Sequence, residues 1–295
     1  MPREVLIIGG GLIGSSIAWR LAQKGARVTI ADAGNLGGEA SPAGAGMLSP
    51  GAEFDKPSVW RDLGLESIRL YPSFVEELQT ETGIDTDFQM FHPEDGIVDP
   101  AALLRALRCA CESRKVRIMR EHVTTVEPRD YSSMVIAAGA WSGQVQVNGV
   151  ILPAVTPIKG HLIGFQFEPG ALGPVRRQGE TYVLQRSSGF LIAGSNEQDV
   201  GFDRAVDLRV CEDIHRRATQ LFPPLEHATP VKRWIGFRPR PTKNGATGDP
   251  HIGRVEGTNV WLAYGHYRNG ILLTPVTAQR ITQQISNEIS VLPGV

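Results

Sequence analysis

The N-terminal part of the chain consists of apolar runs separated by one glycine-rich stretch. Residues 4–8 form a short, mostly apolar run, the pattern of a strand that is buried in a parallel sheet. The glycine-rich residues 9–14 follow, and apolar residues then recur along residues 17–22 at the spacing of one helix face. Residues 27–31 form a second apolar run that ends at Asp32. This order predicts a strand–helix–strand unit with parallel strands.

The apolar pattern changes at residue 151. Before it, buried runs alternate with helical spacings, as in a parallel sheet with connecting helices. After it, apolar and polar residues alternate in short runs separated by Gly, Pro and Ser, which predicts antiparallel strands. The end returns to the first pattern, with a strand at 259–264, a turn at 265–270 and a final helix. We therefore expect an α/β protein in which an antiparallel-sheet domain interrupts a parallel-sheet domain. The other predicted helices are 58–83, 100–114 and 207–221, and the other predicted strands are 116–119, 122–126, 134–138, 161–167, 181–185 and 189–193.

The composition is that of an ordinary globular chain, with 41% hydrophobic and 21% charged residues among 295. The 30 basic and 31 acidic residues leave a formal net charge of −1 without blocks of like charge, which argues against nucleic acid or an anionic membrane surface as partner. No apolar stretch approaches the ~20 residues that span a membrane, and no signal peptide is evident, so we expect a cytoplasmic protein. Cys109, Cys111 and Cys211 form neither a disulfide framework nor a metal-binding spacing, and we expect packing residues and no metal site.

The glycine-rich stretch matches a dinucleotide-binding fingerprint. Gly9, Gly11 and Gly14 have the G-x-G-x-x-G spacing directly after the first strand and at the start of the helix. In this motif the glycines allow a tight turn, a close approach of the backbone to a pyrophosphate and close packing of helix on strand, and the helix N-terminus favours the phosphates. Asp32, at the end of the second strand, can accept a hydrogen bond from a ribose hydroxyl. These features together predict a dinucleotide site.

Later glycine clusters favour FAD over a nicotinamide cofactor. The small residues 43–47 offer a flat backbone surface against which a flavin ring can lie. Residues 135–139 resemble the late strand that closes FAD-binding sheets. Residues 249–253 and 265–270 would place a helix N-terminus near the ribityl and pyrimidine end of the flavin, where the helix dipole favours the negative charge of a reduced flavin. A nicotinamide dehydrogenase would leave these segments without a role. Because no cysteine lies in them, we expect non-covalent FAD.

With these motifs in place, the sequence resembles the D-amino-acid oxidase superfamily, and most closely the glycine oxidases of thiamine biosynthesis. The matching segments follow one another in family order across nearly the whole chain, and the last two are the most specific. The resemblance implies a Rossmann-like FAD-binding domain of the glutathione-reductase type and a smaller α+β substrate domain built on an antiparallel sheet. The matching segments are 7–14, 45–48, 96–100, 137–142, 158–160, 236–239 and 265–273.

The same resemblance sets the expected domain boundaries. The chain lacks a segment between Gln89 and Met90 that in relatives includes a strand and helices beside the substrate, and it is also shorter near Arg129–Ser133. The substrate domain is therefore expected to be shortened. The predicted domains are a discontinuous FAD-binding domain of residues 1–50, 94–150 and 246–295, and a substrate domain of residues 51–93 and 151–245.

Three side chains are implied as catalytic-site residues by the resemblance. Arg238 would grip the substrate carboxylate, for which a planar guanidinium is suited because it can donate two parallel bonds while staying charged. Arg268 would line the same pocket, and Tyr182 matches a pocket tyrosine. From the residues alone, other roles stay open: Arg238 as a surface cation, Arg268 as the partner of a nearby carboxylate, and Tyr182 as a half-buried sheet residue. His266 is interpreted as a turn residue rather than a base, and Glu197 as a candidate for the pocket rim.

The fingerprint and the resemblance together give the residues expected to contact FAD. Val123 matches a position whose backbone contacts the adenine, and Asp32 stands where the family more often has Glu. The full predicted set is Gly9, Gly11, Leu12, Ile13, Gly14, Asp32, Ala33, Ala43, Gly44, Ala45, Gly46, Met47, Val123, Ala138, Gly139, Trp141, Arg238, His266, Arg268, Asn269, Gly270 and Ile271.

The resemblance implies oxidative deamination of glycine or another small amino acid or amine. Hydride would pass from the α carbon of the neutral amine to flavin N5, and O2 would reoxidise the flavin to give H2O2, while the protein supplies position and electrostatics. The shortened substrate domain keeps two alternatives open: a catalytically degenerate flavin-binding homologue or subunit, and a flavin dehydrogenase with an acceptor other than oxygen. The resemblance also favours a homo-oligomer, which nothing in the chain's own pattern indicates.

Overall fold

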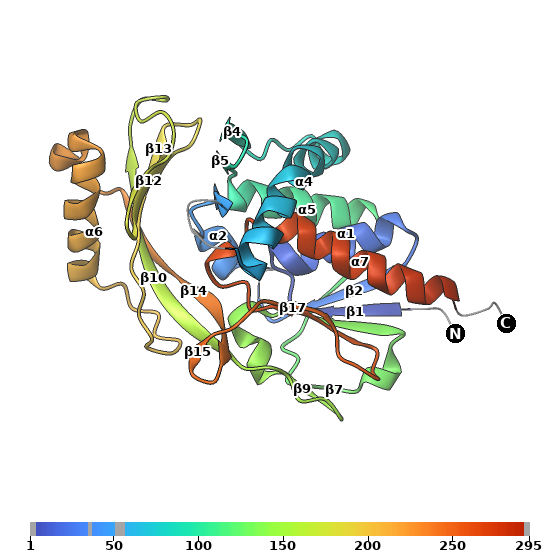
Figure 1. Cartoon of the computed structure of the whole chain (residues 1–295). Helices are drawn as coiled ribbons and strands as arrows, with labels where there is room; N and C mark the ends of the chain where they lie inside the picture. Colours follow the sequence, from blue (N-terminus) through green and yellow to red (C-terminus); the bar gives the residue numbers. More distant parts are fainter. Residues whose placement is uncertain (1–3, 35–36, 51–56, 292–295) are drawn as a thin grey trace.

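The N-terminal apolar run forms an interior strand of a six-stranded sheet (Figure 1) in the computed structural model, which describes residues 4–34, 37–50 and 57–291. This strand, β1 (Glu4–Ile8), pairs in parallel with β2 and with β8, so that Ile7 lies opposite Ile30 and Val135. Such a strand is covered on both faces, which explains its nearly unbroken apolar sequence. In sheet order the strands are β16 (His251–Arg254), β17 (Val260–Tyr264), β8 (Ser133–Ile136), β1, β2 (Arg27–Asp32) and β6 (Arg117–Arg120).

Different layers cover the two faces of this first sheet. On one face α1 (Leu12–Gln23) packs between α5 (Pro100–Ser113) and α7 (Thr274–Val291), as Figure 1 shows. Helix α5 begins where the sequence predicts it, because the Asp99 side chain accepts the Ala101 N–H at 2.9 Å and Pro100 occupies the first turn. The other face is covered by the short strands β7 (Thr125–Val126) and β9 (Gln146–Val147) and by the 3-10 helix η2 (Gly139–Gln144).

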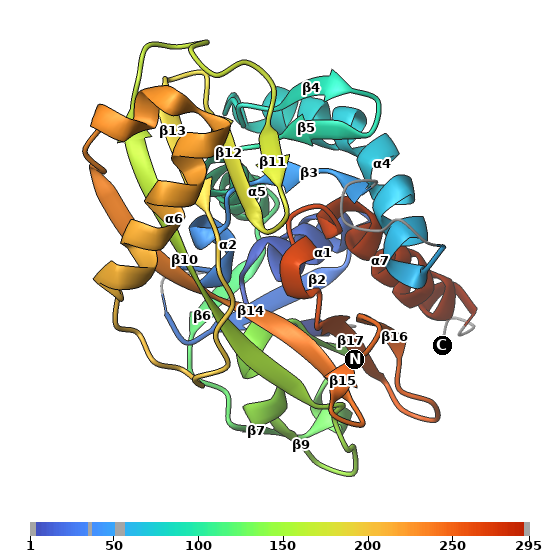
Figure 2. The ribbon, with the colours of Figure 1, turned by 60° about the vertical axis from the view of Figure 1, so that its left-hand side comes forward.

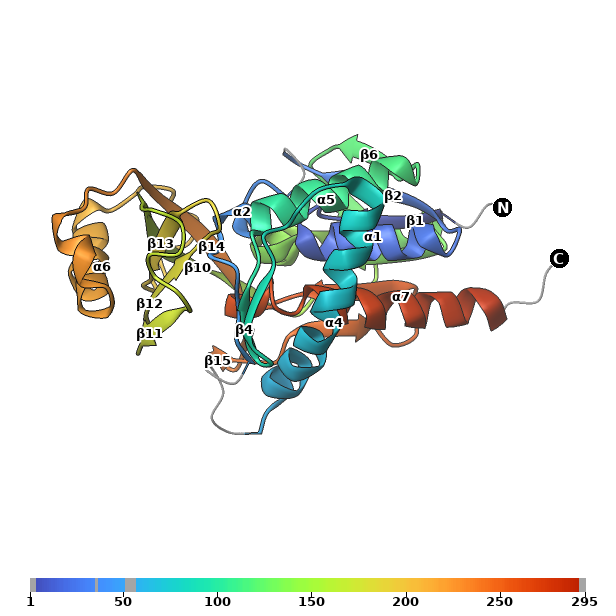
Figure 3. The same ribbon diagram turned by 90° about the horizontal axis from the view of Figure 1, so that it is seen from above.

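The predicted antiparallel domain is a second six-stranded sheet, built around two long strands that lie side by side in Figure 2. β10 (Val155–Gln166) and β14 (Lys232–Lys243) pair over most of their length, with Ile158 opposite Arg238. Beyond β10 the sheet continues with β13 (Phe190–Gly194), β12 (Thr181–Gln185) and β11 (Arg176–Gln178), and beyond β14 with β15 (Ala246–Thr247). α6 (Leu208–Leu221) packs on one face of this sheet, on the side away from α1, α4 and α7 (Figure 3).

β10 is longer than the predicted strand 161–167, because Pro157 does not interrupt it. Pro157 lies opposite Pro239 of β14. The N–H of Lys159, two residues further on, points away from β14 and donates to Gln198 O at 2.9 Å. Pro157 therefore lacks an N–H only on the side where β14 does not need one. The predicted strand 122–126 is wrong at its start: only Thr125–Val126 is a strand, and His122 and Val123 line a cavity instead.

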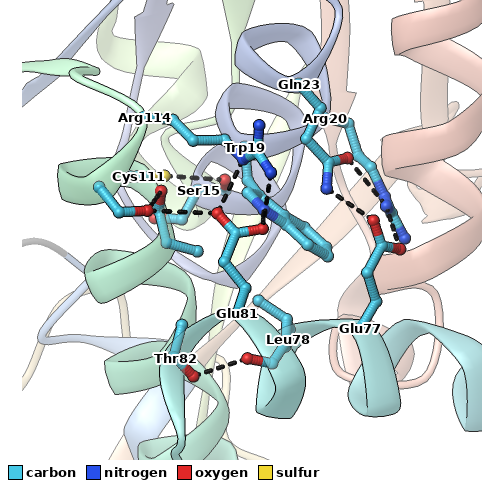
Figure 4. Close-up of polar contacts among 12 residues, drawn as sticks. Ser15, Trp19, Arg20, Gln23, Glu77, Leu78, Glu81, Thr82, Cys111 and Arg114 are labelled. Carbon is cyan, nitrogen blue, oxygen red and sulfur yellow. Dashed lines mark hydrogen bonds and ion pairs between the residues drawn. The ribbon is translucent and has the colours of Figure 1, made fainter.

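A long helix, α4 (Val59–Thr82), packs against α5 and α7 and is tied to α1 by two carboxylates. Glu81 accepts the Trp19 indole N–H at 3.1 Å and Arg114 Nε at 2.7 Å, and Glu77 accepts Arg20 Nη1 at 2.6 Å (Figure 4). Helix α4 thus shares its core with the first sheet. The domain boundaries stay a prediction, and this packing favours moving α4 from the substrate domain to the cofactor domain.

The remaining elements are short. β3 (Met47–Leu48), β5 (Asp95–Ile97) and β4 (Gln89–His92) form a three-stranded sheet. The other short helices are α2 (Ala40–Ala43), η1 (Pro128–Asp130), η3 (Pro223–His227) and η4 (Tyr267–Asn269).

The three cysteines lie in the interior or close to it. Cys111 and Cys211 are buried and Cys109 is half-buried, and burial raises the pKa of the Cys111 thiol to about 12. Among the described helices, none has the length and apolar character needed to span a membrane.

Candidate active site

The carboxyl ends of four neighbouring strands of the first sheet open onto one cavity. β1 leads into Gly9, β2 ends at Asp32, β8 leads into Ala137, and β17 leads into the turn that contains His266. In open α/β sheets this edge is where ligands bind. The cavity has a volume of about 950 Å³ and extends from this edge to β10, β12 and β14 of the second sheet. It therefore joins the predicted cofactor segments to the predicted substrate residues.

The glycine fingerprint has the geometry that the motif requires. Gly9 has φ +104°, and a Cβ there would lie 2.6 Å from the Ala137 carbonyl carbon. A Cβ at Gly14 would overlap the Gly9 carbonyl oxygen, so Gly14 allows α1 to pack on β1. Gly11 is the N-cap of α1 and lines the cavity. The glycines thus keep both the helix N-terminus and the cavity floor free of side chains.

Asp32 joins the first turn to the end of β2. Its Oδ2 accepts the Gly10 N–H at 2.7 Å and its Oδ1 accepts the Gly34 N–H at 3.0 Å, and the residue lines the cavity. The carboxylate therefore organises the fingerprint loop besides its predicted contact with a ribose. Ser41 is a further lining residue that the sequence does not reveal: its Oγ accepts the Leu12 N–H at the start of α1, at 3.1 Å.

A buried arginine supports the small-residue segment that was expected to face the flavin. Arg186 Nη1 donates to Val98 O at 2.8 Å, and its Nη2 donates to Ala45 O. Burial lowers the pKa of Arg186, because removal from water disfavours its charge. Gly46 has φ +89°, and a Cβ there would collide with the Val98 carbonyl. Residues 43–47 are thereby held in one position along the cavity wall.

Arg238 reaches the cavity from β14 and is held by neutral partners. Its Nη1 donates to Asn196 O at 2.9 Å and its Nη2 to Ser195 Oγ at 3.0 Å. No Asp or Glu among the described residues forms an ion pair with it, whereas Arg240, two residues further along β14, pairs with Asp199 at 2.8 Å. Each terminal nitrogen of Arg238 has a second N–H, and together these can meet a carboxylate.

Gly160 lies in β10, next to β14, and because it has no side chain it leaves room for the Arg238 guanidinium. A Cβ at Gly160 would lie 2.6 Å from Arg238 Cζ. Because the obstacle is the end of a flexible side chain, we expect Gly160→Ala to fold and to bind FAD while displacing the guanidinium. The apparent KM for the expected small amino-acid or amine substrate should rise about tenfold or more, with a melting temperature close to wild type. Steady-state kinetics and a thermal melt check this; an unchanged KM would contradict the placement.

The other two predicted substrate residues also lie at the cavity. Arg268, after β17, lines the cavity, and its Nη1 lies 3.8 Å from Glu197 Oε1. Arg268 is therefore both a cavity residue and the partner of a carboxylate, the two roles that the sequence left open. Tyr267 donates its hydroxyl to Glu197 Oε2 at 2.6 Å, and burial is the main reason that the pKa of Tyr267 rises to about 12. Tyr182, in β12, is nearly buried and lines the cavity. Glu197 is not a lining residue; it pairs with two that are.

His266 is buried beneath the turn that follows β17. Its side chain is 2% exposed, and Nε2 lies 3.0 Å from Thr277 Oγ1 on α7. Burial lowers the pKa of His266 to about 3, with a smaller contribution from His251. The ring is therefore neutral at ordinary pH, which fits a packing residue of the turn better than a proton carrier.

The buried His266 predicts acid lability. The unfolded chain binds a proton near pH 6.5 while the folded chain does not until about pH 3, so stability is complete above pH 6.5 and falls as the pH is lowered. Between pH 6.5 and 5 the loss from this group is about 2 kcal/mol. In denaturant unfolding, His266→Gln should lose correspondingly less unfolding free energy than wild type between pH 6.5 and 5. A substitution of the exposed His227, His227→Gln, should lose as much as wild type. Equal pH slopes in all three proteins would contradict this.

The structure brings the predicted cofactor residues together with one exception. All of them line the cavity except Gly14, which lies behind the fingerprint loop at the contact of α1 with Gly9. Sequence reasoning missed residues that carry no motif and that come from loops distant in the chain. Among them, Arg204 pairs with Glu39 across the cavity wall at 2.9 Å. The missed lining residues include Glu39, Ser41, Trp60, Glu121, His122, Gln144, Arg177, Glu180, Ser195 and Arg204.

Comparison with known proteins agrees with this geometry. The family model described as "DAO: FAD dependent oxidoreductase" matches residues 4–90 and 89–284, most of the chain. The chain belongs to this DAO family. Among curated members, it is 28% identical to a glycine oxidase of Pseudomonas putida over 352 aligned positions, covering 97% of this chain and 95% of that protein. It is also 30% identical to a bifunctional protein ThiO/ThiG of Synechocystis, covering 97% of this chain and 52% of that protein.

Solved structures of DAO-family proteins superpose closely on this chain. The crystal structure of glycine oxidase from Geobacillus kaustophilus gives a TM-score of 0.88 at 26% identity, covering 97% of this chain and 95% of that one. Iminodiacetate oxidase from Chelativorans sp. BNC1 gives 0.84 at 22% identity, covering 98% and 97%, and shares the fold. The expected fold, a parallel-sheet cofactor domain with an antiparallel-sheet domain, is confirmed.

The DAO family also locates the shortening. The family model matches in two parts that meet at residues 89–90, in β4, and the 352 aligned positions exceed the 295 residues of this chain. β4 and β5 here join through the short turn at Pro93–Glu94. Asp95 in β5 accepts Arg177 Nη2 at 2.6 Å, and Arg177 lines the cavity. Additional residues at this point of the chain would therefore enter near the part of the cavity that Arg177 lines.

The cavity fits FAD, the cofactor of the DAO family. The glycine cradle at Gly9, the exposed N-terminus of α1 and the carboxylate of Asp32 suit a pyrophosphate and a ribose. The segments 43–47 and 266–271 both line the cavity, and they adjoin where Gly44 faces the Ile271 side chain. No described group of three or more His, Cys, Asp and Glu residues is arranged to hold a metal.

Proposed function

We propose that this protein is an FAD-dependent oxidase of glycine or another small amino acid or amine. One observation carries the proposal: the Arg238 side chain lines the cofactor cavity and bonds only neutral partners among the described residues. A half-buried cation with such partners favours an anionic ligand, and a carboxylate matches its fork geometry. The glycine oxidases among the curated relatives support an amino acid as the source of that carboxylate.

The chain's own residues bind and orient the substrate. Arg238 holds the carboxylate through the N–H groups that Asn196 and Ser195 leave over. Arg268 and Tyr182 line the same end of the cavity and restrict how the substrate lies. When bound, FAD would supply the acceptor for the hydride of the Cα–H bond, with O2 as the final oxidant that is reduced to H2O2 and water releasing ammonia from the imine product.

The proposal also assigns the cofactor contacts. The Gly9–Gly14 turn and the α1 N-terminus take the pyrophosphate, Asp32 takes a ribose hydroxyl, and Val123 lies at the adenine. The segments 43–47 and 266–271 take the flavin. The position of each in the cavity wall, Gly14 apart, supports this assignment.

A panel assay with the FAD-loaded protein tests the proposed activity. Glycine, N-methylglycine, D-alanine and larger amines are offered in air, with oxygen uptake and peroxide recorded together, and a second series offers an artificial dye under nitrogen. Peroxide in proportion to oxygen consumed with a small amino acid is the expected result. Dye reduction without peroxide would contradict the oxidase and favour a dehydrogenase, and no turnover with any amine would favour the degenerate homologue.

A further inference from the structure

A buried histidine next to Gly160 is oriented by a hydrogen bond that fixes its tautomer. His161, in β10, is fully buried, and its Nε2 accepts the N–H of Asp207 at 3.0 Å. A backbone N–H can only donate, so Nε2 carries no proton and the neutral ring carries its proton on Nδ1. Burial lowers the pKa of His161, which keeps the ring neutral.

The proton on Nδ1 is directed at Asn196. The Asn196 side-chain atom nearest the ring accepts the His161 backbone N–H at 2.8 Å, which identifies it as the oxygen Oδ1. His161 Nδ1 lies 3.1 Å from the same oxygen and donates to it. Asn196 is thus held by two donors from one residue. The Asn196 main-chain carbonyl, in turn, accepts Nη1 of Arg238.

We propose that His161 is a positioning residue for substrate binding: its Nδ1–H fixes Asn196, and the Asn196 carbonyl sets the direction of the Arg238 guanidinium. The inference rests on the proposed role of Arg238 as the carboxylate-binding group. It explains why a polar ring is buried beside the cavity, since a hydrophobic residue at 161 would leave Asn196 Oδ1 with one donor fewer. Lys159, on the same strand, is anchored separately by Asp203 at 2.6 Å.

The competing explanation is that His161 only anchors the start of α6. Asp207 is the N-cap of that helix, and its N–H is the group bonded to Nε2. The two hydrogen bonds of the ring can be separated by substitution. The amide nitrogen of Asn can replace Nδ1 and keep the donor to Asn196, whereas the amide of Gln reaches the Nε2 position and keeps the acceptor for Asp207. His161→Asn and His161→Gln are therefore matched variants with opposite losses.

The experiment uses the FAD-loaded full chain with these variants, Asn196→Ala, the double variant His161→Gln/Asn196→Ala, and Arg238→Ala. It measures kcat and KM for glycine, and the Kd of acetate, a carboxylate without the amine, from the shift of the flavin spectrum. FAD content and melting temperature show that each variant is folded. We expect His161→Gln to raise KM and the acetate Kd about five- to thirtyfold, as for loss of one or two kcal/mol, with a smaller change in kcat.

His161→Asn is expected to stay within about threefold of wild type in both constants, because it keeps the donor. Asn196→Ala should resemble His161→Gln, and the double variant should add little, since both remove one link. Equal effects of Asn and Gln, an unchanged KM in His161→Gln, or additive effects in the double variant would overturn the inference. If only Arg238→Ala raises KM, the inference fails alone; if Arg238→Ala does not, the proposed function of Arg238 fails with it. If His161→Gln does not fold, Asn196→Ala tests the inference alone: a raised KM for glycine and a raised Kd of acetate support it, and unchanged values overturn it.

Discussion

Arg238→Ala is expected to raise the apparent KM for glycine by two to three orders of magnitude. The substitution removes a pair of charge-assisted hydrogen bonds inside the cavity, and losses of about 3–4 kcal/mol correspond to a ~10²–10³-fold change. The fold should not change, because the described residues that the Arg238 side chain bonds are Asn196 and Ser195, and both bonds lie at the cavity. Steady-state kinetics with glycine, together with the FAD content of the purified variant, measure both quantities.

Arg240→Ala is the matched control for this substitution. Arg240 lies on the same strand but pairs with the exposed Asp199 and does not line the cavity. Its KM should stay within about threefold of wild type, since exposed ion pairs contribute little. A wild-type KM in Arg238→Ala, or equal effects in both variants, would remove Arg238 from the substrate site.

Gly14→Ala is expected to cost the protein its FAD and much of its stability. The added methyl group would overlap the Gly9 carbonyl oxygen and lie 3.1 Å from the Gly9 carbonyl carbon, both backbone atoms that cannot rotate away. α1 must then move off β1, which displaces its N-terminus from the pyrophosphate position. We expect a loss of about 2–3 kcal/mol of unfolding free energy and at least a tenfold weaker affinity for FAD.

Gly143→Ala provides the control, since its Cβ would meet Val155 Cγ1 at an ordinary contact of 3.5 Å and its φ is not positive. Flavin retained after gel filtration and the unfolding midpoint in denaturant compare the two. A Gly14→Ala protein that keeps FAD and its midpoint would show that α1 does not pack on β1 as described.

Much of the cofactor half could be predicted from the sequence, because its signals are local. A buried parallel strand leaves an apolar run at residues 5–8, and the fingerprint glycines follow it at a fixed short spacing. Arg238 was found for a different reason, since only the resemblance in the segment 236–239 distinguished it from Arg240. Physical reasoning on the residues left that choice open; the structure separates the two by their partners.

The rest of the site depends on contacts between distant segments. Arg186 supports Ala45, Arg204 pairs with Glu39, and His161 bonds Asn196, but none of these pairs has a recognisable spacing. β10 was predicted too short, and only its pairing with β14 shows that the strand continues through Pro157, whose missing N–H is not needed. Val123 was likewise placed in a predicted strand, 122–126, although the residue precedes the strand and lines the cavity.

The visible spectrum of the FAD-loaded protein, recorded before and after glycine is added without oxygen, tests the central claim most directly. The account predicts that the bands of oxidised flavin bleach, and that air restores them with release of H2O2. A protein that binds FAD but keeps its oxidised bands with glycine and every other small amino acid or amine would contradict the proposed oxidation. A protein that takes up no FAD at all would contradict the cofactor site itself.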